Sequence, residues 1–139
     1  MSVLYSAEAV STGDGRNGLV RSSDGVLVLA LGAPKELGGS GESTNPEQLF
    51  AAGYSACFHS ALRMAAREAG VPLRDDEVTA RVHLERDGTG YRINADLRVS
   101  LPGVEHEVAV GLAEGAHGRC PYSRAVRGNI RVEVVVLEA

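Results

Sequence analysis

The sequence predicts an α+β fold in which antiparallel sheets accompany one long helix. Three observations predict this class. Alternating apolar and polar residues indicate a hairpin over 78–101, helix start and stop signals enclose residues 46–69, and the predicted elements follow the order β-β-β-α-β-β-α-α-β. A chain of 139 residues is long enough for one domain with its own core, so we expect residues 1–139 to form a single domain.

Three strands are predicted before the long helix, over residues 2–10, 19–22 and 26–31. A Gly-rich turn at 13–18 separates the first two, and Asp24-Gly25 is a strong tight-hairpin signal between the second and third. Residues 32–45 then form a polar, Gly-rich connection whose length is typical of functional or mobile loops.

The long helix has the clearest local signals in the chain. Asn45 is a good N-cap, Pro46 suits the first helical position, and Gln48 follows the cap at capping-box spacing. Gly70 is the expected stop. The first half of this helix consists largely of small, uncharged residues, so we expect it to be buried.

The second half of the chain continues with paired strands and two short helices. Residues 78–84 and 93–101 alternate and are joined by a turn at 87–90, which indicates an antiparallel hairpin with one buried face. A spacing of four residues between Val104, Val108 and Leu112 predicts an amphipathic helix that ends near Gly118. The remaining elements are a helix that starts at Cys120-Pro121 and closes at Gly128, and a final strand over 130–137.

Composition argues against several classes of protein. The net charge is −4 with acids and bases interleaved, and there is no basic stripe, so we expect no nucleic-acid surface. The longest unbroken apolar run, 26–31, is far too short to span a membrane, and no export signal is visible. We therefore expect a cytoplasmic protein, in which a permanent structural disulfide is not expected.

Two cysteines lie in different local settings. Cys57 is in the middle of the long helix, whereas Cys120 is a predicted N-cap, where the helix dipole favours a thiolate. Each could equally be a small core residue. The side chain of Cys57 leans toward Gly53, and the missing side chain there either leaves room for a small reactant or allows close helix packing.

A reactive thiol in mid-helix requires a cation nearby. Arg16, in the Gly-rich turn, is the candidate, and Glu47 could hold its guanidinium by a bidentate pair. The alternatives are a solvated turn arginine and a glutamate that interacts with the helix dipole. Ten residues separate Glu47 from Cys57, about 15 Å of helix rise. Either Arg16 bridges that gap or Glu47 approaches Cys57 from a second subunit, and we favour the second.

Two long motifs and one turn resemble a known family. Residues 44–58, TNPEQLFAAGYSACF, resemble the first-cysteine motif of the organic hydroperoxide resistance proteins, which share a superfamily with the osmotically inducible protein C group. Cys120-Pro121-Tyr122-Ser123, followed by residues 127–129, resembles their second-cysteine motif. Residues 14–18, DGRNG, match the arginine turn of the family.

The resemblance implies antiparallel sheets wrapped around a long central helix, in an intertwined homodimer with active sites at the subunit interface. It also implies a peroxidase that reduces alkyl and fatty-acid hydroperoxides, with no bound cofactor. Cys57 would be the peroxidatic cysteine, Cys120 the resolving cysteine, Arg16 the activating arginine and Glu47 its carboxylate partner. A lipoylated protein would supply the dithiol reductant as co-substrate.

Other roles for the same residues remain open. Phe50, Tyr54 and Tyr122 are expected walls of an apolar pocket around Gly53, although each could be plain core. A zinc site is a rival for the cysteines because His117 lies three residues before Cys120; however, Cys57 and His59 diverge by about 200° on a helix and cannot chelate together. A non-catalytic thiol sensor or small-ligand binder is the other rival.

Overall fold

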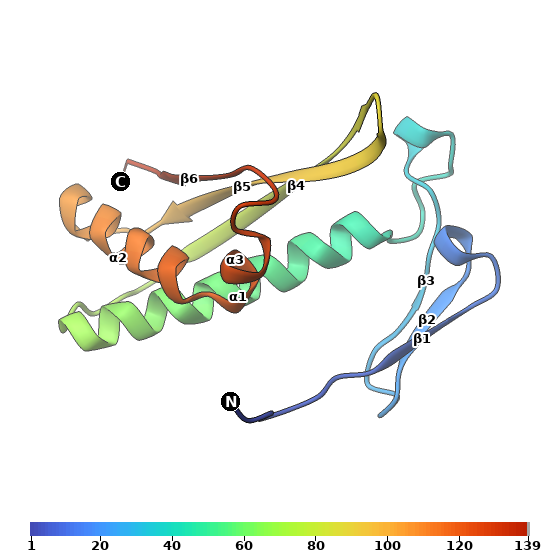
Figure 1. Ribbon diagram of the computed structural model, residues 1–139. Helices are drawn as coiled ribbons and strands as arrows, with labels where there is room; N and C mark the ends of the chain where they lie inside the picture. The colour runs from blue at the N-terminus through green and yellow to red at the C-terminus, as the bar shows by residue number, and fades with distance from the viewer. Residues whose placement is uncertain (139) are drawn as a thin grey trace. The chain divides into compact units, whose positions relative to one another are not determined.

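The computed structural model describes residues 1–138, and the chain divides into two compact units, residues 1–49 and 50–139. The helices and strands follow the predicted order β-β-β-α-β-β-α-α-β, with two additional short 3₁₀ turns, as Figure 1 shows. The α+β class is confirmed. The prediction of a single domain stays a prediction, and the two units are described in turn.

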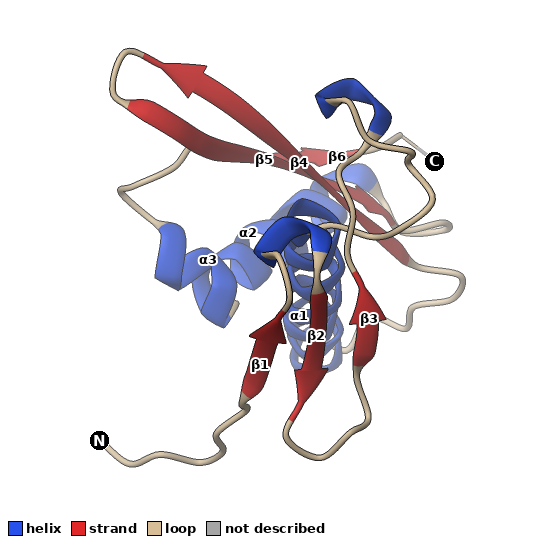
Figure 2. Ribbon diagram, turned by 90° about the vertical axis from the view of Figure 1, so that its right-hand side faces the viewer, coloured by secondary structure: helices blue, strands red, loops and turns tan. Residues whose placement is uncertain are grey.

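The first unit contains a three-stranded antiparallel sheet (Figure 2). Its strands are β1 (Ala9–Thr12), β2 (Leu19–Ser22) and β3 (Val28–Ala30), and the 3₁₀ turn η1 (Gly15–Asn17) lies between β1 and β2. The predicted strand over 2–10 is wrong for residues 2–8. The reason is that β2 has four residues and pairs only with Ala9–Thr12, so earlier residues have no partner strand.

The connection over 32–45 contains a second 3₁₀ turn, η2 (Lys35–Leu37), and closes on itself through a backbone bridge between Leu31 and Thr44. Leu31 is the one apolar side chain among residues 1–49 that is buried. Residues 1–49 also expose large apolar side chains to solvent, namely Met1, Val3, Leu4, Tyr5, Val10, Val26, Leu27, Val28 and Leu37. The first unit therefore has almost no core of its own.

Helix α1 (Pro46–Ala69) has the predicted bounds. The peptide N–H of Gln48 donates to the Asn45 side chain at 2.9 Å, and Gly70 ends the helix in the left-handed region at φ +71°. The side chain of Gln48 does not complete a capping box, because its oxygen accepts a hydrogen bond from the Thr44 hydroxyl at 2.7 Å.

The two faces of α1 differ in burial. One face packs into the core of the second unit and consists of Tyr54, Phe58, Ala61, Leu62, Ala65 and Ala66. Ala52, Ala56 and Ser60, spaced four residues apart on the same face of the helix, remain exposed. The expectation that the whole first half of the helix is buried is therefore wrong for this chain by itself, because the core of the second unit covers only one face.

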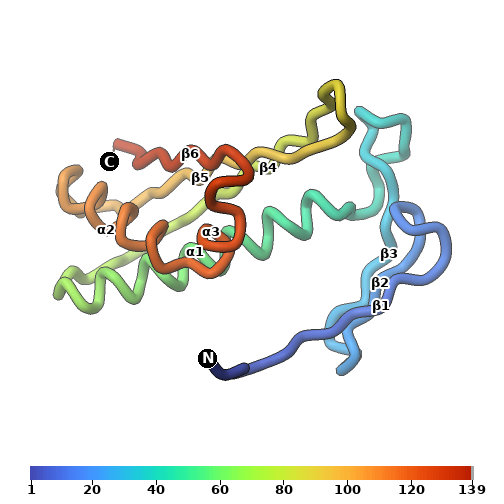
Figure 3. Tube along the Cα trace, in the orientation of Figure 1, coloured from blue at the N-terminus to red at the C-terminus, as the bar shows by residue number. Residues whose placement is uncertain are grey.

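The second unit contains a three-stranded sheet in the order β4-β5-β6. Strands β4 (Glu77–Asp87) and β5 (Gly90–Ser100) form the predicted antiparallel hairpin. Strand β6 (Val132–Val136) pairs parallel to β5, so the expectation of purely antiparallel sheets is wrong here. The chain passes through two helices between β5 and β6, and this crossover returns it in the same direction (Figure 3).

Helices α2 (His106–Arg119) and α3 (Pro121–Val126) form this crossover, and α1 and α2 lie along one face of the sheet (Figure 1). Helix α2 buries Ala109, Leu112, Ala113 and Ala116. The predicted stripe is thus partly wrong, because Val104 precedes the helix and Val108 is exposed. Among the described residues, no helix is long and apolar enough to cross a membrane.

Candidate active site

The two cysteines, 63 residues apart in sequence, meet in the core of the second unit. Cys57 lies in the middle of α1, and Cys120 occupies the junction at which α2 ends and α3 begins. Their Sγ atoms are 3.6 Å apart, and both are free thiols. Cys120 is fully buried whereas Cys57 is partly exposed. A small reactant can therefore reach Cys57 more easily than Cys120.

The surroundings of Cys57 within this unit favour the protonated thiol. Burial raises the pKa of the Cys57 thiol, and the neighbouring Cys120 adds to that effect. A hydrogen bond from the peptide N–H of Tyr122 to the sulfur lowers the pKa but does not outweigh burial. The causes of this shift include no cation, so these surroundings by themselves do not stabilise a thiolate at Cys57.

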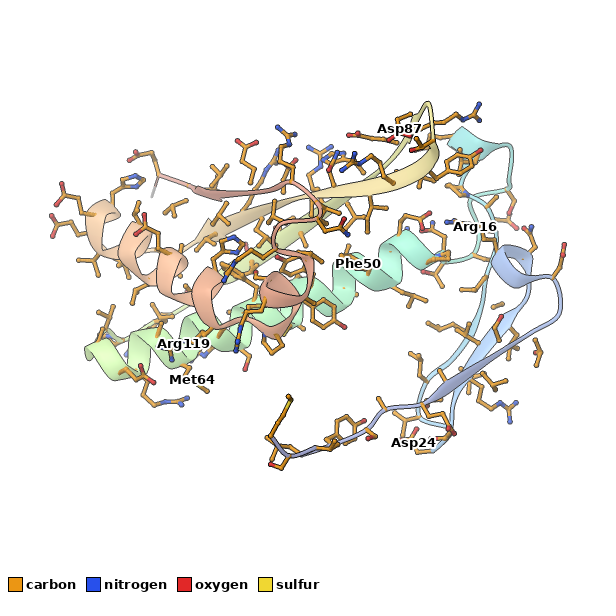
Figure 4. All side chains as sticks on the ribbon, in the orientation of Figure 1. Arg16, Asp24, Phe50, Met64, Asp87 and Arg119 are labelled. Carbon is orange, nitrogen blue, oxygen red and sulfur yellow. The ribbon has the colours of Figure 1, made fainter. Side chains whose placement is uncertain are left out.

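Arg16 and Glu47 form a bidentate ion pair in the first unit. The Arg16 guanidinium, presented by η1, donates from Nη1 and Nη2 to the two carboxylate oxygens of Glu47 at 2.7 and 3.1 Å. Arg16 is labelled in Figure 4. This geometry fixes the plane of the guanidinium, as two parallel hydrogen bonds do. The contact is the one expected from the sequence, and the roles of Arg16 and Glu47 toward Cys57 stay predictions.

Three aromatic rings form a cluster beside the thiols. The ring centroids of Phe50 and Tyr122 are 6.0 Å apart, those of Phe50 and Tyr54 are 6.0 Å apart, and those of Tyr54 and Tyr122 are 5.7 Å apart. Phe50, labelled in Figure 4, comes from the first turns of α1. Tyr54 is fully buried, whereas Tyr122 is 39% exposed and forms the outer wall of the cluster.

Gly53 allows Tyr122 to approach α1 closely. A Cβ atom at position 53 would lie 2.7 Å from the Tyr122 hydroxyl and 3.2 Å from two ring carbons. Of the two interpretations open from the sequence, the structure supports close packing, since the ring of Tyr122 fills the space beside Gly53. Room for a reactant at this position would require the Tyr122 ring to move.

Comparisons with known proteins agree with the fold and with the family resemblance. The profile of the OsmC-like protein family matches residues 39–135. The chain belongs to the OsmC-like family. Relatives include the organic hydroperoxide resistance protein-like 2 of Staphylococcus epidermidis, with 45% identity over 96% of this chain and 95% of the relative, and OhrA of Bacillus subtilis, with 45% identity over 97% of each. A crystal structure of an organic hydroperoxide resistance protein from Elizabethkingia anophelis matches with a TM-score of 0.94 and 45% identity over 100% of both chains.

This OsmC-like chain also contains a buried polar network that sequence reasoning missed. The Tyr54 hydroxyl is 2.7 Å from Oγ of Ser123, and that oxygen is 2.8 Å from Nδ1 of His117. Arg127 donates to the backbone carbonyl of His117 at 2.8 Å. The available signal was the spacing of His117 and Ser123, three residues before and after Cys120, which on helices places side chains one turn from the sulfur.

The histidines of the OsmC-like chain have partners other than a metal. His117 is bonded to Ser123, and Nε2 of His59 lies 2.6 Å from a carboxylate oxygen of Asp76. Over residues 1–138, no three His, Cys, Asp or Glu side chains come together in a way that could hold a metal ion.

Proposed function

We propose that this protein is a cysteine-based peroxidase that reduces organic hydroperoxides to alcohols. The observation that carries the proposal is the pair of reduced thiols 3.6 Å apart, one fully buried and one partly exposed. This arrangement suits a reaction in which the exposed sulfur is oxidised first and the buried sulfur follows. The relatives named organic hydroperoxide resistance proteins indicate the substrate class.

In the first step the Cys57 thiolate attacks one oxygen of the hydroperoxide. The O–O bond breaks, the attacked oxygen stays on sulfur as a sulfenic acid, and the departing alkoxide takes a proton to become the alcohol. In the second step the Cys120 thiol attacks the Cys57 sulfur. The S–O bond breaks, water leaves with the thiol proton, and a Cys57–Cys120 disulfide forms.

Arg16 is proposed as the cation that makes the first step possible. Because burial raises the pKa of Cys57, a guanidinium beside the sulfur is needed to favour the thiolate, and it would also stabilise the alkoxide as charge develops on it. The bidentate pair with Glu47 supports this role, since it holds the guanidinium in one orientation. Glu47 could act in its own subunit or across a dimer.

The aromatic cluster of Phe50, Tyr54 and Tyr122 is proposed as the wall that selects organic over hydrogen peroxide. Each methylene of substrate that is buried against such a wall contributes about 0.8 kcal/mol. Movement of the partly exposed Tyr122 ring would open the space beside Gly53 for the alkyl group.

A homodimer is proposed as the functional form. Two surfaces support it. The exposed small residues Ala52, Ala56 and Ser60 would let a second copy of α1 approach closely, and the apolar side chains of the first unit lack a core in the single chain. Burial of both surfaces by a second copy would produce the intertwined arrangement, with α1 at its centre, that the family resemblance implies.

The reductant is proposed to be a dihydrolipoyl group on a protein partner in the cytoplasm. Reduction proceeds by thiol–disulfide exchange: one thiolate of the dithiol attacks one sulfur of the Cys57–Cys120 disulfide and releases the other cysteine. The second thiol of the dithiol then attacks the mixed disulfide, which releases the remaining cysteine as the reductant closes to its cyclic disulfide. Its two thiols supply the electrons and protons that the cysteines regain, so the cycle balances without a bound cofactor.

Steady-state consumption of cumene hydroperoxide with dihydrolipoamide tests the proposal. The natural protein should turn over, Cys57→Ser should not, and Cys120→Ser should complete one oxidation of Cys57 without recycling. A natural protein that binds the hydroperoxide but does not consume it would instead be a ligand binder. One that consumes a single equivalent and is not recycled by any dithiol would be a thiol sensor.

A further inference from the structure

The polar network and the thiol pair are built on the same helical turns. Tyr54 lies three residues before Cys57 on α1, and His117 and Ser123 lie three residues before and after Cys120. The chain of bonds from Tyr54 through Ser123 to His117 therefore connects α1, α3 and α2, the three helices that present the two sulfurs.

Burial makes these bonds costly to lose. Tyr54 and Ser123 are both 0% exposed, and no buried side-chain nitrogen or oxygen in the described chain lacks a hydrogen-bond partner. Removing the Ser123 hydroxyl would leave the Tyr54 hydroxyl without its partner in the core, and a buried polar group without a partner is destabilised by about 1–3 kcal/mol. The network thus holds the helices in one relative arrangement.

The protonation states of the network suit a structural bond between neutral groups. Burial lowers the pKa of His117, and the nearby Arg127 lowers it further, so the imidazole is neutral at pH 7. Burial raises the pKa of Tyr54, which keeps the phenol protonated. The hydroxyl proton of Ser123 can then point to either neighbour while both bonds are kept.

The position of the Cys120 sulfur depends on the angle between α2 and α3. Cys120 is both the C-cap of α2 and the N-cap of α3. Its peptide N–H donates to the Ala116 carbonyl, and its own carbonyl accepts from the peptide N–H of Arg124. The bond between His117 and Ser123 spans this junction. The Sγ atoms are 3.6 Å apart in the reduced protein and about 2.05 Å apart in a disulfide. They therefore need to approach by only about 1.5 Å for the bond to form.

We infer that Tyr54, Ser123 and His117 are positioning residues that keep the Cys120 sulfur within reach of Cys57 and so accelerate formation of the Cys57–Cys120 disulfide. This inference rests on the proposed function, because it assigns the network to the second step of that reaction. Ser123 and His117 are assigned no contact with the peroxide or with the oxygen that is transferred, so the first step should not depend on the bond between them.

A single-turnover experiment separates the two steps. Ser123→Ala and the control Ser100→Ala are mixed with one equivalent of cumene hydroperoxide, and sulfenic acid is trapped with dimedone at successive times. In Ser123→Ala, oxidation of Cys57 should stay within about twofold of the natural rate while disulfide formation slows by about tenfold and dimedone labelling rises. Disulfide formation at the natural rate in Ser123→Ala, or an equal loss in both steps, would overturn the inference.

Two substitutions of His117 distinguish a bond from mere packing. His117→Asn retains an amide near the position of Nδ1, whereas His117→Leu fills similar space without a hydrogen-bonding group. The Asn variant should form the disulfide within about threefold of the natural rate, and the Leu variant should behave like Ser123→Ala. Equal rates for the Asn and Leu variants would contradict a role for the hydrogen bond.

Equilibration with reduced and oxidised dithiothreitol tests the positioning without any peroxide. The equilibrium constant for the Cys57–Cys120 disulfide should fall by about tenfold in Ser123→Ala and remain unchanged in Ser100→Ala. This measurement keeps the two hypotheses apart. If the natural protein lacks peroxidase activity but Ser123→Ala still shows this shift, the proposed function alone is refuted. If the natural protein is an active peroxidase and Ser123→Ala shows neither the shift nor a slower second step, the inference alone is refuted.

Discussion

Asp76 connects helix α1 to the segment that leads into β4, and its replacement by Asn tests how strongly that connection stabilises the second unit. Its carboxylate lies 2.6 Å from Nε2 of His59 and 2.7 Å from Nη1 of Arg63. Only 5% of the Asp76 side chain is exposed. Burial by itself would raise the pKa of Asp76, but hydrogen bonds from Arg63 and His59 outweigh it and lower the pKa from 3.8 to about 2.

The difference in pKa sets the expected size of the effect. The gap between 3.8 and about 2 corresponds to at most about 2.5 kcal/mol of stability. Because the guanidinium of Arg63 is half exposed, solvent screening reduces the expected contribution to about 1–2 kcal/mol. The folded-state pKa of Asp76 is depressed, so this stability is complete above the unfolded pKa and is lost as the pH falls from about 4 through about 2.

Urea unfolding at one fixed protein concentration, at pH 7, 5 and 3, measures the effect. Asp76→Asn should be less stable than the natural protein by about 1–2 kcal/mol at pH 7, and the deficit should shrink at pH 3. Asp75→Asn is the matched control, since it removes the same charge one residue earlier. Equal stability of the two variants at pH 7, or an Asp76→Asn deficit that does not change between pH 7 and pH 3, would refute the reasoning.

Three further predictions concern the site. Gly53→Ala should gain up to about 1 kcal/mol of helix propensity, and the net gain in urea unfolding should be smaller because the new Cβ would lie 2.7 Å from the Tyr122 hydroxyl. It should also displace the Tyr122 ring and lower kcat/KM for cumene hydroperoxide severalfold; unchanged kcat/KM would mean that the ring is no part of the pocket. If Arg16 is the proposed cation, Arg16→Met should shift alkylation of Cys57 by iodoacetamide to higher pH, because burial raises the thiol pKa and the guanidinium would no longer counter it. An unshifted profile would remove Arg16 from the mechanism. Glu47→Gln should lower kcat/KM by about tenfold, since it breaks the bidentate pair, whereas full activity would show that the pair does not orient the guanidinium.

Much of the fold could be predicted from the sequence because its signals are local. Asn45 and Gly70 delimit α1 through bonds and dihedral angles within a few residues of each end, and the alternation over 78–101 specifies a hairpin by itself. The two cysteine motifs and the arginine turn were likewise visible as strings of neighbouring residues. The same local reasoning failed for residues 2–8, where alternation was present but the partner strand was too short.

Local signals in the sequence therefore predicted most of the helices and strands and the family of the chain, whereas the reactivity of Cys57 and Cys120 stays a prediction. Three features became visible in the structure alone: β6 runs parallel to β5, the Tyr122 ring fills the space at Gly53, and Ser123 connects Tyr54 to His117. These contacts join side chains up to 69 positions apart. Their formation depends on how α1, α2 and α3 pack on one sheet, and no periodicity or capping signal within a single segment specifies that packing.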